Sequence, residues 1–205
     1  MLKRTSINIV NKNLKDNKNW KVLDIGCGFS ANEYADVIAD VQDLSKHYKE
    51  KKFVRITENK LPFKDKEFDF VISSHVIEHV ENFEFFIKEL ERISSKGYIE
   101  LPTRFADNLI FENKKDHIWW FVFDDEKNHL IACKKNQIIE PFINVSIGKM
   151  FEKAFRESFV LELSWNNKID YIIDSNLRNE EFETITFYKL IKKFFSKKIR
   201  SFIKN

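Results

Sequence analysis

The sequence has little cysteine, little glycine and no long apolar run. Two cysteines among 205 residues do not make a disulfide framework, so we expect both to be reduced thiols in a cytoplasmic protein. No apolar stretch approaches the roughly 20 residues that cross a bilayer, and the amino terminus lacks the apolar core of a signal peptide. A net charge of +3 is too small to indicate nucleic-acid binding by itself. These absences predict an ordinary globular protein of one domain.

The scarcity of glycine gives weight to residues 22–30, Val-Leu-Asp-Ile-Gly-Cys-Gly-Phe-Ser, which hold two of the four glycines. Glycine permits positive φ and lets a ligand approach the main chain without a Cβ in the way. The stretch therefore predicts a buried strand that runs into a turn at Gly26 and Gly28. An acid, Asp24, precedes the glycines, and Ser30 and Ala31 stand where a dinucleotide-binding fingerprint would place a third glycine.

The first half of the chain alternates between strand and helix patterns. Apolar runs predict strands at residues 21–25, 37–40, 53–56, 68–73 and 98–101. Apolar positions at three- and four-residue spacing predict an amphipathic helix over residues 80–93, and residues 1–19 are expected to form a polar helix packed on the sheet. Residues 32–36 leave room for barely two helical turns. Alternating elements of this kind predict parallel βαβ units.

The second half reads differently. Two apolar runs, 119–123 and 129–132, flank a polar segment and predict a hairpin, and residues 150–159 predict a helix. Residues 159–165 and 168–173 flank Asn166-Asn167, a strong two-residue turn signal, and predict a second hairpin. The tail, residues 186–204, is predicted to be a basic amphipathic helix.

Two stretches resemble class I S-adenosylmethionine (SAM) dependent methyltransferases, over about residues 20–102. Residues 22–30 resemble their motif I, and residues 68–80, Phe-Asp-Phe-Val-Ile-Ser-Ser-His-Val-Ile-Glu-His-Val, resemble the motif IV strand and turn of the type 11 group. The resemblance implies a Rossmann-like α/β fold with a doubly wound, mostly parallel seven-stranded sheet. We expect a shortened first helix, an inserted hairpin after strand five and an antiparallel terminal hairpin. Residues 1–183 would form the domain, with an insertion at about 103–148, and residues 184–205 the tail helix.

The resemblance also implies SAM as cofactor. The backbone of Gly26 and Gly28 would approach its methionine moiety, and Asp24 would help to hold the ammonium group. Asp40, at the end of the second strand, would accept hydrogen bonds from both ribose hydroxyls. Asp36 and Asp43 are the competing acids for that role.

Further cofactor contacts are implied at two strand ends. Thr57 or Glu58 would meet the adenine amino group, in place of the usual aspartate. Ser73, Ser74 and His75 would line the sulfonium at the end of the fourth strand. No bound metal is expected.

Methyl transfer requires alignment and desolvation more than a dedicated base. Where a proton must be removed, His117 is the first candidate and His79 the second. Residues 116–120 would form one wall of an acceptor pocket, although an ordinary packed histidine among core aromatics explains them equally well. Glu100 is a further candidate for orienting a substrate hydroxyl.

The acceptor is expected to be a small molecule, a saccharide of the cell envelope or a lipid-linked intermediate, because no residues match the signatures of nucleic-acid amino methyltransferases. The tail carries an apolar stripe, with lysines beside it and no acid from Thr184 onward. That pattern fits a peripheral contact with the inner face of an anionic membrane. It fits equally a helix that docks on its own domain.

Two alternatives remain open at the level of sequence. His75-Val-Ile-Glu78-His79 fits the H-x-x-E-H zinc signature of inverted-motif metallopeptidases. Such a site needs both histidines on one helical face and a third ligand from elsewhere. The second alternative is a SAM-binding protein without catalytic activity.

Overall fold

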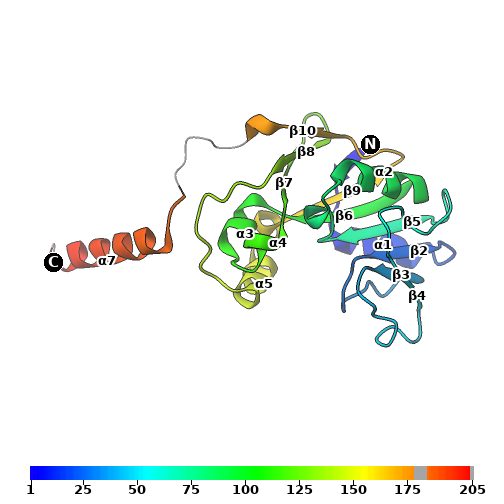
Figure 1. Ribbon diagram of the computed structural model, residues 1–205, viewed down its shortest axis with the longest axis horizontal. Coiled ribbons are helices and arrows are strands. Elements are labelled where there is room, and N and C mark those ends of the chain that lie inside the picture. Colours follow the sequence, from blue (N-terminus) through cyan, green and yellow to red (C-terminus); the bar gives the residue numbers. More distant parts are fainter. Residues whose placement is uncertain (178–183, 204–205) are drawn as a thin grey trace.

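The structure, a computed structural model, describes residues 1–177 and 184–203 (Figure 1). Its centre is a seven-stranded sheet in the order β1-β9-β6-β5-β2-β3-β4. The strands are β1 (Leu2–Arg4), β2 (Val22–Ile25), β3 (Val37–Asp40), β4 (Lys52–Arg55), β5 (Phe70–Ser74), β6 (Lys96–Pro102) and β9 (Val160–Asn166). The five adjacent strands β6, β5, β2, β3 and β4 pair in parallel. Strand β9 runs antiparallel to both of its neighbours, β6 and β1. The predicted mostly parallel α/β sheet is confirmed.

Helices cover both faces of this sheet. Successive side chains of a strand point to opposite faces, so β5 is buried on both sides. Phe70 and Ile72 belong to the apolar cluster under α1 (Ile7–Asp16). Val71 belongs to the larger cluster under α2 (Phe83–Ile93). The near-continuous apolar run of β5 follows from this double coverage.

The amino terminus forms a short strand followed by a helix, where the sequence predicted only a helix. Residues 2–4 form β1 before α1 begins, and Leu2, which is fully buried, pairs with Trp165 of β9. An uncovered strand edge leaves main-chain groups without partners, and β1 satisfies those of β9. Because β1 is three residues long and contains Lys3 and Arg4, it carries no strand pattern of its own.

The predicted terminal hairpin is wrong. Asn167 does make the expected tight turn, with a φ of 67°. Beyond it, however, β10 (Tyr171–Ile173) leaves the main sheet and pairs in parallel with β8 (His129–Lys134). The edge of β9 is already occupied by β1, whereas β8 offers an open edge. The other predicted hairpin, β7 (Trp119–Asp124) with β8, is confirmed.

The crossover from β2 to β3 contains no helix, where a shortened one was expected. The carbonyl groups of this loop find another donor instead. The Lys51 ammonium donates to the carbonyl oxygens of Asn32 (3.2 Å), Glu33 (2.9 Å) and Ala35 (2.8 Å). One long side chain thus satisfies oxygens that would otherwise be exposed at this edge of the sheet.

The remaining elements lie after β5 and β6. A short 3-10 helix, η1 (Ile77–His79), follows β5, and a second, η2, covers Ser175–Leu177. Between β6 and β9 lie α3 (Arg104–Leu109), α4 (Asn113–Asp116), the β7–β8 hairpin, α5 (Val145–Ala154) and α6 (Arg156–Phe159). The helix predicted at 150–159 is therefore two helices, separated at Phe155.

The tail helix is confirmed as α7 (Phe187–Ile203), and Figure 1 shows it projecting away from the sheet. Its entry is fixed by main-chain hydrogen bonds from Ile185 to Ile138 and from Glu140 to Ile185, each 2.8 Å long. Within residues 1–177 and 184–203, no helix combines the length and the apolar character that spanning a membrane requires.

Candidate active site

A cleft of about 660 Å³ opens where the carboxyl ends of β2, β3 and β5 meet. This edge is where open α/β sheets bind ligands, because the loops diverge there. Asp40, Glu58 and Glu81 line the cleft, together with His75 and His79, and none of its described lining residues is a lysine or an arginine. The lining therefore favours a ligand that carries positive charge.

The glycine turn forms one wall of the cleft. Gly26 and Gly28 both have positive φ, 70° and 54°. A Cβ on Gly26 would lie 2.5 Å from Cγ2 of Val76, so the turn packs tightly against the segment after β5. A Cβ on Gly28 would meet no heavy atom within 4 Å. Gly28 thus leaves open space for a ligand beside the main chain.

Asp24 lies buried beneath this turn, only 2% exposed. Its Oδ2 accepts a 2.7 Å hydrogen bond from the Asn32 amide, and its Oδ1 has no hydrogen-bond partner among the described residues. Burial raises the pKa of this carboxyl to about 7, against the opposing hydrogen bond from Asn32 and the charge of Lys51. A buried carboxylate with an unused oxygen is costly to folding unless a ligand uses it.

Asp40 ends β3 with its side chain at the cleft. Its two oxygens accept amide hydrogen bonds from Gly28 (3.0 Å) and Gln42 (2.9 Å), which fix the carboxylate between the two loops. A carboxylate has about four acceptor positions, so each oxygen retains one. The competing acids have local roles instead: Asp36 accepts from the Val22 amide, and Asp43 from Ser45.

Tyr48 holds the glycine turn in place, and no sequence pattern indicated this role. Its hydroxyl donates to the Gly28 carbonyl (2.7 Å) and accepts from the Ala31 amide (3.0 Å). With Lys51, it fixes the loop that stands in place of the first crossover helix. A lone tyrosine and a lone lysine in a polar segment carry no periodic pattern, so sequence reasoning passed over both.

His75 follows β5 in the left-handed region, with a φ of 55°. Its Nδ1 lies 3.2 Å from Glu78 Oε1 and its Nε2 lies 3.2 Å from Glu100 Oε1. Burial opposes its charge, but the two carboxylates outweigh burial and raise the pKa of His75 to about 10. We therefore describe His75 as a cation held between two acids at the rim of the cleft.

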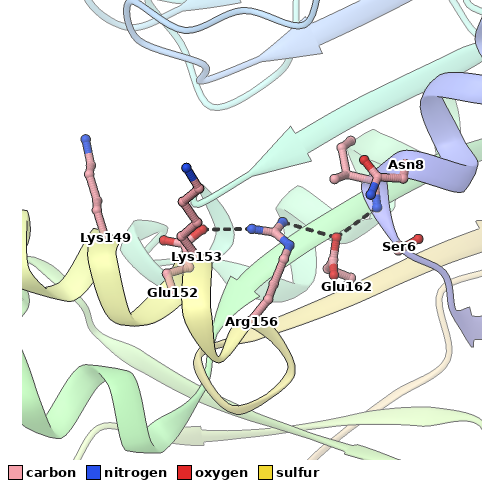
Figure 2. Close-up of a pocket in the computed structure, with 8 residues that line it drawn as sticks. Ser6, Asn8, Lys149, Glu152, Lys153, Arg156 and Glu162 are labelled. Atoms are coloured by element: carbon pink, nitrogen blue, oxygen red, sulfur yellow. Dashed lines mark hydrogen bonds and ion pairs between the residues drawn. The ribbon is translucent and has the colours of Figure 1, made fainter.

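Glu100 connects His75 to a second hollow of about 420 Å³ on the other side of this charge network. Arg156 binds Glu100 there, and Figure 2 shows it reaching between Glu152 and Glu162, with distances of 2.8 and 3.1 Å. Burial raises the pKa of Glu100, but hydrogen bonds from His75 and Tyr98 outweigh it and lower that pKa overall. These groups neutralise one another, so Glu100 is engaged in structure and not free for a substrate hydroxyl.

The inserted segment is attached directly to η1. His79 donates its Nδ1–H to the Asp116 carbonyl (2.9 Å), and the Ile118 amide donates to the Glu78 carbonyl (2.8 Å). The His79 and His117 rings are in edge-to-face contact, with centroids 4.5 Å apart. His79 lines the cleft, whereas His117 is buried directly behind it.

The glycine turn, Asp40, strand β5 and His75 after it all lie within residues 23–99, which match a family model described as a methyltransferase domain. Over these residues the chain is similar to the type 11 methyltransferase family.

A relative from Methanocaldococcus jannaschii, described as an uncharacterized protein, is 35% identical over 115 residues, which are 52% of this chain and 50% of that protein. The chain thus spans about half the length of the curated relative that it matches.

Solved structures also resemble the chain. A SAM-dependent methyltransferase from Aquifex aeolicus is 15% identical, with a TM-score of 0.41 over 76% of this chain and 88% of the other. The PH0226 protein from Pyrococcus horikoshii is 18% identical, with a TM-score of 0.44 over 79% and 90%.

The structure brings most of the predicted cofactor residues to one cleft. The lining includes Gly26, Gly28, Asp40, Glu58 and His75. Asp24 and Ser73 are buried in the strands, and the Ser73 hydroxyl has no partner among the described residues. Neither Thr57 nor Ser74 is among the lining residues that the structure describes. Of the three residues predicted to line the sulfonium, His75 is the one among the described lining residues of the cleft.

The geometry around His75 and His79 does not support the metallopeptidase alternative. His75 follows a strand with positive φ, and His79 ends a 3-10 helix, so the two do not share a helical face. Both ring nitrogens of His75 face carboxylates. The H-x-x-E-H pattern here is a strand end followed by a turn.

Proposed function

We propose that this chain is a SAM-dependent methyltransferase, with residues 1–183 as the catalytic domain and the cofactor in the cleft beside the glycine turn. One observation carries the proposal: the buried, unused oxygen of Asp24 lies beneath a carboxylate-lined cleft in the segment that matches the methyltransferase family. A cleft of about 660 Å³ is within the usual range for cofactor sites.

The residues present suit this cofactor. Gly28 leaves room for the methionine portion, and Asp24 would hold its ammonium group directly or through water. Asp40 retains acceptor positions for the ribose hydroxyls. Glu58, in the cleft lining beyond β4, would accept from the adenine amino group. When bound, the cofactor supplies a methyl group on a positively charged sulfur, which the acidic lining of the cleft favours.

Catalysis by the chain's own residues would consist mainly of alignment and exclusion of water. Where the acceptor loses a proton, we assign the base role to His79 of the metal-free chain, because its ring faces the cleft. His117, bonded to Asp107, stands behind His79 and would position it. This order reverses the ranking expected from sequence.

We further propose that the acceptor is a small molecule, a saccharide or a lipid-linked intermediate, and that α7 brings the enzyme to the inner face of an anionic membrane. No described lysine or arginine lines the cleft, which is unfavourable for a nucleic-acid phosphate backbone. Beyond Phe187, which stacks on Phe142, the apolar stripe of α7 is exposed, as at Phe194 and Ile199 (61% and 58%), and this exposure supports a contact with a membrane.

The test is calorimetric titration of the purified chain with SAM, followed by an assay for S-adenosylhomocysteine with hydroxyl-bearing acceptors. Asp40→Ala should weaken SAM binding by roughly 10-fold or more, because hydrogen bonds to a charged group contribute about 1.5–3 kcal/mol each. Asp43→Ala, an exposed acid of the same loop, is the matched control and should bind normally. Tight SAM binding without turnover on any acceptor would favour the non-catalytic alternative.

A further inference from the structure

His79, which lines the cleft, and His117, which is buried behind it, each have one ring nitrogen without a partner among the described residues. His79 donates its Nδ1–H to the Asp116 carbonyl, and the Nδ1 of His117 lies 2.6 Å from Asp107 Oδ1. Because both acceptors are oxygens, the neutral form of each ring carries its hydrogen on Nδ1, and Nε2 is then the nitrogen with a lone pair for a metal ion. Within the described part of the chain, neither Nε2 has a hydrogen-bond partner.

Glu78 supplies a third unused atom beside them. The residue is fully buried, and its Oε1 is held by His75 Nδ1. Its Oε2 is buried and has no hydrogen-bond partner among the described residues. An unpaired buried carboxylate oxygen is unfavourable unless a cation or donor meets it. This observation is independent of the histidine pair and indicates a positively charged ligand.

The three side chains converge. Glu78, His79 and His117 each offer one ligand atom, and these atoms lie within 4.8 Å of one another. Ligand atoms around a tetrahedral ion, with bonds of about 2.0–2.2 Å, are roughly 3.4 Å apart, so small side-chain rotations would close the site. We propose that Glu78, His79 and His117 bind a divalent transition-metal ion.

Hydrogen bonds fix the orientation of both histidine rings, as they commonly do around a bound metal ion. Metal-binding histidines commonly donate their other N–H to a carboxylate or a main-chain carbonyl, which fixes the ring. His117 does the first with Asp107, and His79 does the second with Asp116. Asp107 is itself fixed, because it also accepts hydrogen bonds from Trp120 Nε1 and Asn113 Nδ2, both 3.0 Å long.

The main chain also fixes the register of the three ligands. The Ile118 amide bonds to the Glu78 carbonyl, and Trp119 Nε1 donates to the Val80 carbonyl (2.9 Å). Thus η1 and the inserted segment are joined on both sides of the histidine pair. The site brings together residues that are about 40 positions apart, which is why a local motif does not reveal it.

The ligand set selects the kind of ion. Two imidazoles and one carboxylate suit Zn²⁺, Mn²⁺ or Fe²⁺ better than Mg²⁺ or Ca²⁺, which prefer oxygen ligands. This site differs from the H-x-x-E-H interpretation because His75 is not a ligand. A second group of possible ligands consists of His75, Glu100 and Glu152. Arg156 forms ion pairs with both of these carboxylates, and His75 also pairs with Glu100, so their negative charge is already neutralised.

The position of the site suggests its use. His79 lines the cleft, whereas Glu78 and His117 lie behind it, so an ion held by all three would be reached from the cleft. Three protein ligands leave coordination positions open. Those positions would orient an acceptor that carries oxygen donors, such as a hydroxyl or a carboxylate. Only this last step rests on the proposed methyltransferase function.

The experiment is titration of the full chain, first dialysed against a chelator, with Zn²⁺ alone and with Mn²⁺ alone. We expect one ion per chain and an increase in melting temperature in the presence of the ion. His79→Ala and His117→Ala should each weaken binding more than 10-fold. His47→Ala, an exposed histidine outside the site, is the matched control and should bind as the parent does.

Two further variants keep the test decisive if a histidine variant does not fold. Glu78→Gln preserves shape and should weaken binding more than 10-fold. Asp107→Asn leaves all three ligands in place and should weaken binding roughly 10- to 100-fold, as the loss of a supporting partner does. Binding that is absent in the parent, or equal in the parent and Glu78→Gln, would overturn the metal site.

The metal proposal and the function proposal fail separately. SAM titration of the same metal-free protein reports on the cofactor cleft alone, since Asp24 and Asp40 are not metal ligands here. Metal binding without SAM binding would leave the metal site intact and contradict the proposed function. SAM binding without metal binding would support the proposed function and contradict the metal site.

Discussion

The hydroxyl of Tyr48 donates a 2.7 Å hydrogen bond to the carbonyl oxygen of Gly28. The same hydroxyl accepts from the Ala31 amide, so one side chain holds both ends of the turn that would contact the cofactor. In this chain the loop from β2 to β3 has no helix, and Tyr48 and Lys51 supply the order that a helix would otherwise give. The shape of the cleft therefore depends on two side chains outside the recognisable motif.

Tyr48→Phe should loosen the glycine turn without disturbing the core. The variant loses two hydrogen bonds, which contribute about 0.5–1.5 kcal/mol each, and we expect unfolding free energy to fall by roughly 1–2 kcal/mol. SAM affinity should fall several-fold, because the free protein samples more conformations of the turn. Urea denaturation and calorimetry measure the two effects. Tyr188→Phe, on the exposed tail helix, should change neither.

The two glycines of the turn should respond differently to alanine. Gly26→Ala places a Cβ 2.5 Å from Val76 and adds strain at positive φ, so its main effect should be a loss of stability of about 2 kcal/mol or more. Gly28→Ala carries only the strain, about 1–2 kcal/mol, but its Cβ projects into open space at the cleft. We expect Gly28→Ala to lose more SAM affinity than stability. Equal SAM affinities for Gly28→Ala and the parent would contradict the assigned cofactor position.

Asp24 should make stability depend on pH. Its pKa is about 7 in the folded chain and 3.8 ordinarily, so between these values the folded state binds the extra proton. Stability should therefore fall as pH rises from about 4 to about 7, and level off above that. Asp24→Asn keeps the acceptor for the Asn32 amide and should remove this dependence. At pH 8 it should be more stable by roughly 1–2 kcal/mol, because the buried charge is gone.

The same Asp24→Asn variant should bind SAM at least 10-fold more weakly, since the ammonium group loses its carboxylate. A change that increases stability while reducing binding is expected of a residue retained for its ligand. Denaturation at several pH values and calorimetry at pH 8 measure both effects. A variant that is less stable than the parent at pH 8 would show that the Asp24 charge serves the fold.

The tail helix should bring the chain to anionic vesicles. Each lysine near such a surface contributes about 1 kcal/mol, and Lys189, Lys192 and Lys193 are exposed beside the apolar stripe. We expect the full chain to co-sediment with anionic vesicles and not with neutral ones, and a version that ends at Glu183 to remain in the supernatant. Truncation should lower the melting temperature only slightly, because it removes the Ile185 hydrogen bonds and the Phe187–Phe142 contact but no side chain of the buried core. Negligible pelleting of both forms, with a much lower melting temperature on truncation, would contradict the membrane role.

The sequence predicted the centre of the fold well because that part is locally encoded. Four strands of the parallel sheet, β2, β3, β5 and β6, are buried apolar runs that end at polar or turn residues. The missing strand, Leu2–Arg4, gains its partner only from β9, about 160 residues later. The misplaced one, Tyr171–Ile173, follows a genuine Asn-Asn turn. Its destination depends on which sheet edge is free, and no local pattern records that.

The candidate site likewise contains residues that a local sequence pattern predicts and residues whose roles depend on distant contacts. Asp24, Gly26, Gly28 and Asp40 could be found because strand ends and glycine turns leave a pattern in the sequence. Glu100 looked available but is bound by Arg156, and that pairing crosses 56 positions. The sequence singled out Glu78, His79 and His117 separately but did not predict that they form one cluster. His117 reaches the other two only because the inserted segment folds back on η1.

The most direct test of the cofactor site is calorimetric titration with S-adenosylhomocysteine, which requires no knowledge of the acceptor. We expect one molecule to bind per chain at micromolar strength, on the order of −8 kcal/mol, and both Asp40→Ala and Gly28→Ala to lose most of that affinity. Asp43→Ala should bind as the parent does. Absence of binding in the correctly folded parent, or unchanged binding in Asp40→Ala and Gly28→Ala, would contradict the account.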